Sequence, residues 1–247
     1  MSGSLSPVVV AVTASGQRGG LAIAVDGSIV HHEVLEEDLV HAREIVGRIA
    51  RAFEARDLRP DRVGTVVTDV GPGSFTGMRV GVTVAKTVAW SVGGKVVPVL
   101  APDALAYALG NEAGPRAVLI DAKRSELYLA RYRIEDGAPK RVEPVRLIPR
   151  DTALEATEGD LLLGDGVAAL PSEPPADRLP RPEDFDVPEG GTTDDGIAAT
   201  CPHPATVLRL GLAALRTGGA IAPERIEPFY LRSSDPVARP PKRTAPR

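Results

Sequence analysis

GPGSFTG, at residues 71–77, lies between two apolar segments and decides how the neighbouring chain is interpreted. Residues 63–68 before it form a short apolar run typical of a buried strand, and residues 75–91 carry the small and apolar side chains typical of a helix. A glycine-rich turn between a strand and a helix can present backbone N–H groups to a phosphate. The loop consists of Gly71, Pro72, Gly73, Ser74, Phe75, Thr76 and Gly77.

The loop matches neither of the common phosphate-binding patterns. A P-loop ends in G-K-[ST], but Gly77 is followed by Met78 and Arg79. The dinucleotide pattern G-x-G-x-x-G is missed because the last glycine comes one residue too late. Ser74 and Thr76 are expected to cap the helix, since a hydroxyl can accept hydrogen bonds from the unpaired N–H groups of its first turn. The loop alone leaves phosphate binding open.

The helix after the loop carries small residues at every fourth position. Gly77, Gly81, Ala85 and Ala89 fall near one face, where they would form a smooth groove along the helix. A groove of this kind allows another element to approach closely. The pattern is equally compatible with packing inside the protein and with contact to a partner helix.

The composition is that of a globular protein. The chain has 247 residues, of which 43% are hydrophobic and 25% charged, and its formal net charge is -4. This acidic balance gives no indication of a nucleic-acid-binding face. Cys201 is the single cysteine, which excludes an intramolecular disulfide and a cysteine-based zinc site. With no secretion signal and no membrane span recognised in the sequence, we expect a cytoplasmic protein without contact to membranes.

The periodicity along the chain predicts an α/β protein with two similar lobes, mixed sheets and crossover helices. Strands are predicted at residues 8–12, 21–25, 28–32, 63–68, 96–100, 117–121, 126–134 and 161–163, and helices at about 36–58, 75–91, 103–108 and 205–217. Residues 171–204 are predicted to form a long loop. The tail at 233–247 is rich in proline and arginine, and we expect it to be unstructured and solvated.

Three separated segments resemble one known family. GPGSFTGMRVGVTVAK at residues 71–86 resembles the signature segment of the TsaB (YeaZ) family, and IDAKRSELYLARY at 120–132 and IEPFYLR at 226–232 resemble two further blocks of it. The blocks occur in the family's order, and the resemblance covers roughly residues 8–232. It implies an actin/hsp70/sugar-kinase-like (ASKHA) fold. The expected division is a first lobe at 1–102 plus about 203–220, and a second, smaller lobe at 103–202 plus 221–232.

The resemblance also implies a function and partners. Members of this family act in making threonylcarbamoyladenosine at position 37 of tRNA, as a non-catalytic scaffold and activating subunit that pairs with a TsaD-like transferase. A TsaE-like ATPase binds the pair, tRNA is contacted only through the complex, and the isolated subunit is expected to form a homodimer. No cofactor, metal or catalytic residue is expected. The pairing surface implied for the first two helices comprises Leu39, Ala42, Val46, Ile49, Gly77, Met78, Gly81, Ala85 and Ala89.

The main alternative is a nucleotide-using kinase or ATPase of the same fold class. The family's first strand usually ends in an aspartate, but here Thr13 stands at that position, and a hydroxyl cannot replace a carboxylate as a ligand for a divalent cation. Asp69, which follows another apolar run, is expected to be a loop residue held by backbone N–H groups rather than to replace it. No base or metal is placed by sequence beside Ser74, Thr76 or Asp69.

A protease is the least supported class. The histidines His31, His32, His41 and His203 lack the i, i+4 spacing of a metal-binding helix. A cluster of charged residues, comprising Asp121, Lys123, Arg124 and Glu126, is expected at a turn. It is either a solvated turn or part of a binding site.

Overall fold

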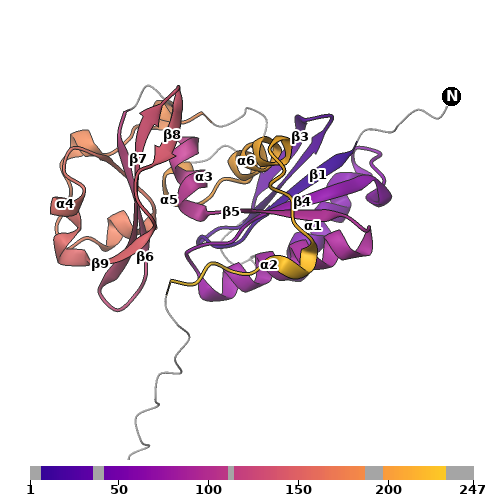
Figure 1. Cartoon of the computed structure of the whole chain (residues 1–247), viewed down its shortest axis with the longest axis horizontal. Helices are drawn as coiled ribbons and strands as arrows, with labels where there is room; N and C mark the ends of the chain where they lie inside the picture. Colours follow the sequence, from indigo (N-terminus) through magenta and orange to yellow (C-terminus); the bar gives the residue numbers. More distant parts are fainter. Residues whose placement is uncertain (1–6, 36–41, 111–113, 187–196, 232–247) are drawn as a thin grey trace, which may run out of the picture.

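Two β-sheets stand side by side in the computed structural model, which describes residues 7–35, 42–110, 114–186 and 197–231 (Figure 1). The first sheet has the spatial order β3-β2-β1-β4-β5. In it, β1 is antiparallel to β2 and parallel to β4, and β4 is parallel to β5. Its strands are β1 (Val8–Thr13), β2 (Gly20–Val25), β3 (Ser28–Val34), β4 (Val63–Asp69) and β5 (Lys95–Val99).

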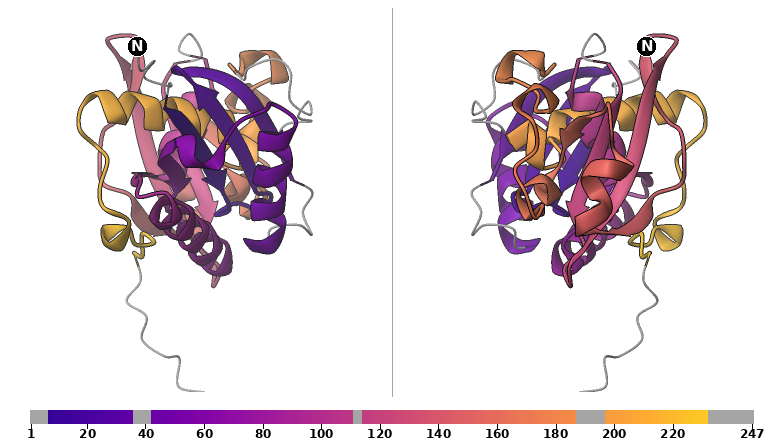
Figure 2. Two further views of the ribbon diagram at one scale, coloured as in Figure 1. Left: turned by 90° about the vertical axis from the view of Figure 1, so that its right-hand side faces the viewer. Right: turned by 90° about the vertical axis from the view of Figure 1, so that its left-hand side faces the viewer.

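Both faces of the first sheet are covered, which explains the uninterrupted apolar sequence of β1. The helices α1 (Ala42–Glu54) and α2 (Phe75–Ser91) lie on one face, and α6 (Pro204–Arg216) lies on the other (Figures 1 and 2). Because successive side chains of a strand alternate between faces, Val10 joins the core beneath α1 and α2, whereas Ala11 joins the core beneath α6. The strands predicted for this lobe and the helices predicted at 75–91 and 205–217 are confirmed, and the helix predicted at about 36–58 is confirmed over Ala42–Glu54.

The helix α6 approaches the sheet closely because of one glycine. A Cβ atom at Gly211 would lie 2.4 Å from a methyl group of Val67 on β4. The helix therefore crosses the strands at a distance that no other residue at this position would allow without a shift.

The second sheet is smaller and has the order β10-β6-β7-β8, with β9 also paired to β7. Its strands are β6 (Arg116–Asp121), β7 (Glu126–Glu135), β8 (Ala138–Arg141), β9 (Arg146–Pro149) and β10 (Leu161–Leu163). Short helices surround it, namely α3 (Ala101–Ala108), α4 (Ala153–Ala156) and α5 (Ile197–Thr200). The α/β class with two sheet-containing lobes is confirmed. The sequence missed β8 and β9, which are short and contain prolines.

The connection between the lobes is fixed by a buried arginine. Arg116, at the start of β6, is fully buried, and its guanidinium donates to the carbonyl oxygens of Ala106 (2.8 Å) and Leu109 (2.6 Å). It also donates to the carbonyls of Gly110 and Gly114. Burial lowers its pKa to about 10. The side chain thereby satisfies carbonyl groups that are left unpaired where α3 ends.

The C-terminal segment differs from its expected place in the second lobe. Ile221 and Val96 of β5 exchange two backbone hydrogen bonds, and Ile226 is buried in the core beneath α1 and α2. Only then does the chain reach the other lobe, where Leu231 packs on the core around α3. Residues 221–226 are thus part of the first lobe. The tail at 233–247 and the start of the first predicted helix lie outside the described residues.

Two histidines meet under the first turn of α6. His203 precedes the helix, and its Nδ1 accepts a hydrogen bond from the backbone N–H of Ala205 (3.3 Å). The ring of His32 on β3 lies edge-on to it, with 5.4 Å between the ring centroids. Burial is the main cause that lowers the pKa of His203 to about 4, and the neighbouring His32 adds to it. The fold therefore holds the His203 imidazole neutral.

This pair predicts a loss of stability in acid. Unfolded histidine has a pKa of about 6.5, so between about pH 6.5 and about pH 4 only the unfolded chain binds the proton, and the free energy of unfolding falls. The full effect corresponds to about 3 kcal/mol, and below about pH 4 it no longer grows. A His203→Asn variant keeps an acceptor for the helix cap. In urea titrations from neutral pH to about pH 4, it should lose correspondingly less stability than the parent protein.

The matched control is His31→Asn, on the more exposed neighbour of His32. It should remove much less of the acid sensitivity. Equal pH dependence in the parent and the His203→Asn protein would contradict the assignment.

Candidate functional site

The glycine loop is hydrogen-bonded to the protein itself. The backbone N–H of Ser74 donates to the carbonyl of Ser15 in the β1–β2 turn (2.7 Å). The Ser74 hydroxyl accepts from the N–H of Gly77 (3.2 Å), so Ser74 caps α2 as predicted. Thr76 is exposed and is not the capping residue. Part of the polar backbone that a phosphate would need is therefore already engaged.

The glycines of the loop are required by close contact with the β1–β2 turn. A Cβ atom at Gly73 would lie 2.4 Å from the carbonyl oxygen of Ser15, and one at Gly77 would lie 1.9 Å from that of Ala14. Gly71 has a φ of +90°, a conformation that favours glycine. These glycines allow two loops to pack backbone against backbone, which accounts for the motif without a ligand.

Asp69, at the end of β4, holds the β1–β2 turn in place. Its carboxylate accepts hydrogen bonds from the N–H groups of Ala14 (2.9 Å) and Ser15 (3.0 Å) and from the Ser15 hydroxyl. Burial raises the pKa of Asp69, and these hydrogen bonds oppose that rise. The expectation that backbone N–H groups hold Asp69 is confirmed, although the residue ends β4 and is not in a loop. Thr13 is buried at the end of β1.

The small-residue face of α2 lies on the protein's own sheet, which corrects its assignment to a partner surface. Gly77, Gly81, Ala85 and Ala89 are all buried, and so is Met78. A Cβ atom at Gly81 would lie 3.3 Å from the Ala14 side chain and 3.3 Å from the Thr68 hydroxyl. The spacing correctly indicated a close approach, but the approaching element is the sheet formed by β1 and β4.

An apolar groove remains open between α1 and α2. It has a volume of about 390 Å³. Val46 and Ile49, both predicted for the pairing surface, line it from α1, and 47% of Val46 is exposed. Leu39 and the side chain of Ala42 lie outside the described part of the chain. The other lining residues are Ala50, Phe53, Glu54, Leu58, Pro60, Val63, Val88, Ser91 and Val92.

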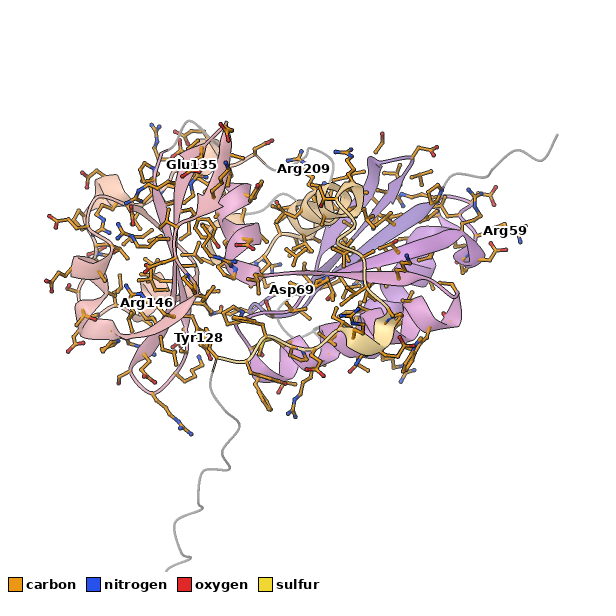
Figure 3. The ribbon with its side chains drawn as sticks, viewed as in Figure 1. Arg59, Asp69, Tyr128, Glu135, Arg146 and Arg209 are labelled. Carbon is orange, nitrogen blue, oxygen red and sulfur yellow. The ribbon has the colours of Figure 1, made fainter. Side chains whose placement is uncertain are left out.

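A second, polar cleft lies where the two lobes meet, with Tyr128 on the second lobe and Asp69 at the inner end of the first sheet (Figure 3). Its volume is about 590 Å³. The first lobe contributes the β1–β2 turn and residues 73–77, which are the later part of the glycine loop and the start of α2. The second lobe contributes the β6–β7 turn, Tyr128 and Asp165. The lining side chains include Ser15, Gln17, Ser74, Phe75, Thr76, Asp121, Lys123, Tyr128 and Asp165.

The carboxylates of the cleft differ in their environment. Asp121 accepts hydrogen bonds from the Lys123 ammonium (2.7 Å) and the Arg150 guanidinium (2.6 Å). Burial would raise its pKa, but these and the backbone hydrogen bond from Lys123 together hold the pKa below its usual value. Burial raises the pKa of Asp165, whose carboxylate accepts the N–H of Asp121 (3.0 Å). Of the predicted charged cluster, Asp121 and Lys123 therefore lie in one wall of the cleft, whereas Arg124 and Glu126 do not line it.

Sequence reasoning missed Tyr128 and Asp165 as members of this wall, and it missed Arg150 as the hydrogen-bond partner of Asp121. Asp165 follows β10 within the sequence Gly164-Asp165-Gly166, and a carboxylate directly after a strand is a signal that could have identified it. Arg150 could not be placed, because the strand β9 that carries the chain to it was not recognised.

Other kinds of site were sought in the described residues. Within residues 7–35, 42–110, 114–186 and 197–231, no three histidine, cysteine or carboxylate side chains gather where they could bind one metal ion. No helix in the same ranges has the length and apolar character needed to cross a membrane.

The chain is similar to proteins of one pathway. A family model described as "TsaD: tRNA N6-adenosine threonylcarbamoyltransferase" matches residues 36–148. The "tRNA threonylcarbamoyladenosine biosynthesis protein TsaB" of Bacillus subtilis is 26% identical over 136 residues, which are 55% of this chain and 59% of that protein. The protein of the same name from Escherichia coli is 24% identical over 234 residues, 92% of this chain and 95% of that protein.

A solved structure has the same fold. YeaZ from Pseudomonas aeruginosa superposes with a TM-score of 0.69 at 21% identity, covering 91% of this chain and 100% of that one. The first curated relatives are matched over only part of their own length, between 25% and 59%.

The packing of the glycine loop predicts that replacing two different glycines by alanine changes the free energy of unfolding in opposite directions. Gly77→Ala places a methyl group against the backbone of Ala14, so the free energy of unfolding should fall by about 2 kcal/mol or more. A Cβ atom at Gly47, inside α1, would meet no neighbouring element within 4 Å. Gly47→Ala should therefore stabilise the protein by about 0.5–1 kcal/mol. Chemical denaturation measures both values, and a Gly77→Ala variant as stable as the parent would contradict the close packing.

Proposed function

Because the chain belongs to the TsaB (YeaZ) family, we propose that it acts in the biosynthesis of threonylcarbamoyladenosine in tRNA, as a subunit that performs no chemistry itself. The observation that supports a non-catalytic role is the packing of the glycine loop on the protein itself. Its glycines pack on the β1–β2 turn, and the carboxylate at the end of β4, that of Asp69, is held by Ala14 and Ser15. A cytoplasmic location, where tRNA is modified, belongs to the same proposal.

The partner in this proposal is a TsaD-like transferase, which docks on the groove between α1 and α2. The family model that matches residues 36–148 is that of the transferase itself, and the matched segment includes both helices. A partner with an equivalent pair of helices can meet this pair about a pseudo-two-fold axis, with apolar side chains of each entering the groove of the other. The exposed Val46 supports this surface.

The remaining partners follow from the family. A TsaE-like ATPase would bind the assembled pair, and no cofactor is required by this chain. In the absence of the transferase, the same groove would be covered by a second copy, since a two-fold interface is self-complementary. The isolated protein is therefore proposed to be a homodimer through α1 and α2.

A nucleotide-using enzyme is the second candidate, because the cleft between the lobes is large and polar. In that case the isolated protein would bind ATP with magnesium and turn it over. Our proposal requires that isothermal titration give no binding and that no phosphate be released. Tight binding with turnover would favour the enzyme and reject the scaffold.

The groove predicts that a charge on its rim weakens pairing and leaves the fold intact. Val46→Asp introduces a carboxylate beside Ile49 and Phe53, where it would be desolvated by the partner. The affinity for the transferase should fall by about ten-fold or more, equivalent to about 1.4 kcal/mol or more. Analytical ultracentrifugation with the TsaD-like protein of the same organism measures it.

Val142→Asp is the matched control. Val142 is 48% exposed and lies in the second lobe, away from the groove. It should pair as the parent does. Both variants should keep the parent's melting temperature within a few degrees, which circular dichroism measures, and undiminished pairing by the Val46→Asp protein would refute the proposed interface.

A further inference from the structure

Two aromatic rings and a guanidinium form an exposed stack beside the cleft. The Arg79 guanidinium lies 3.8 Å from the centroid of the Phe75 ring, and the ring of Tyr230 lies 5.6 Å from that of Phe75. Arg79 Nε also donates to the Tyr230 hydroxyl (3.1 Å). Yet 50% of Phe75 and 43% of Tyr230 remain exposed. The stack is therefore held in place by its own contacts and still offers ring surface to a ligand.

A strained turn reaches the same cleft from the second lobe through Lys123. Lys123, Arg124 and Ser125 all have positive φ values, of 62°, 53° and 63°. Three consecutive non-glycine residues in this region are unusual, and such strain is found preferentially at functional sites. Both cationic residues of the turn are exposed, and Lys123, whose ammonium donates to Asp121, lines the same cleft as Phe75.

The cleft between them offers hydrogen-bond acceptors at its inner wall. Asp165 and Asp121 line it from the second lobe, together with the ring of Tyr128. Carboxylates accept hydrogen bonds from the exocyclic amino groups of nucleobases, and aromatic rings stack on their faces. The site thus combines cations, aromatic rings and carboxylates.

We propose that this cleft mouth binds a single-stranded segment of RNA. An unpaired base stacks on Phe75 and Tyr230, its amino edge turns toward Asp165, and Lys123 and Arg124 contact the adjoining phosphates. The inference rests on the proposed function, because it makes the chain itself a contact for the tRNA that the complex modifies. Unpaired rather than duplex RNA is indicated, since only a splayed base exposes both its face and its edge.

Few phosphates would be contacted, which agrees with the acidic net charge of the chain. The -4 net charge gives no indication of a broad basic face, and the cations of the proposed site are those of the turn and Arg79. The salt dependence of binding should therefore be shallow, with a slope of about one to three.

The test uses the full chain and a fluorescent RNA hairpin of about 17 nucleotides with a loop of about seven, measured by anisotropy in low salt. The double variant Phe75→Ala, Tyr230→Ala should bind about five- to a hundred-fold more weakly, the range that stacking of one base gives. Arg124→Ala should also bind more weakly, and its salt slope should fall by about one. A blunt duplex of the same length should bind no better than the double variant binds the hairpin.

Two control variants each remove an exposed aromatic or cationic side chain at another position. Tyr107→Ala removes an exposed tyrosine of α3, and Arg59→Ala removes an exposed arginine at the far end of the first lobe (Figure 3). Both should bind the hairpin as the parent does. Equal affinity of the parent and the double variant, or no binding of the hairpin by the parent, would overturn the inference.

Pairing with the transferase is measured separately on the same proteins by ultracentrifugation. If the parent protein fails to pair, the proposed function fails, whereas the anisotropy still decides the RNA site. If the double variant loses pairing and keeps the RNA affinity, the stack belongs to a protein interface and the inference is wrong. Retained pairing with lost RNA affinity is the expected result.

Discussion

The buried carboxylate of Asp69 is the interaction on which the centre of the molecule depends. An unpaired charge in this position would be strongly destabilising, so Ala14 and Ser15 must supply their N–H groups to it. This fixes the β1–β2 turn over the end of β4. The carbonyl of Ser15 in turn accepts the N–H of Ser74, which sets where α2 begins. One acidic group thereby determines the position of two loops and a long helix.

As a result, each face of α2 contacts a different part of the molecule. Its glycines and alanines lie on the sheet, Val88 and Val92 face the groove shared with α1, and Phe75 and Arg79 lie beside the cleft. A helix in this position needs small side chains only on the face that lies on the sheet. That requirement explains why small residues recur at every fourth position while the rest of the sequence varies in size.

Sequence reasoning was most successful where one physical rule dominated. Continuous apolar runs identified β1 and β4, and the capping role of Ser74 followed from its place before a helix. The stripe from Gly77 to Ala89 indicated a close contact, but spacing alone does not say which element makes it. Asp165 and Tyr128 line one cleft with Phe75 because distant segments of the chain come together on folding. No local sequence pattern indicates which distant residues will share a cleft.

The order of the elements along the chain has a consequence for synthesis. The second lobe is inserted between β5, which ends at Val99, and α6, which begins at Pro204. Roughly a hundred residues must therefore be made before α6 can cover its face of the first sheet, which takes about 5–20 s at ordinary translation rates. During that time the side chains of Val9, Ala11 and Val67 on the nascent sheet have no helix over them. A chaperone that binds apolar strands would find its target on the ribosome-bound first half of this chain.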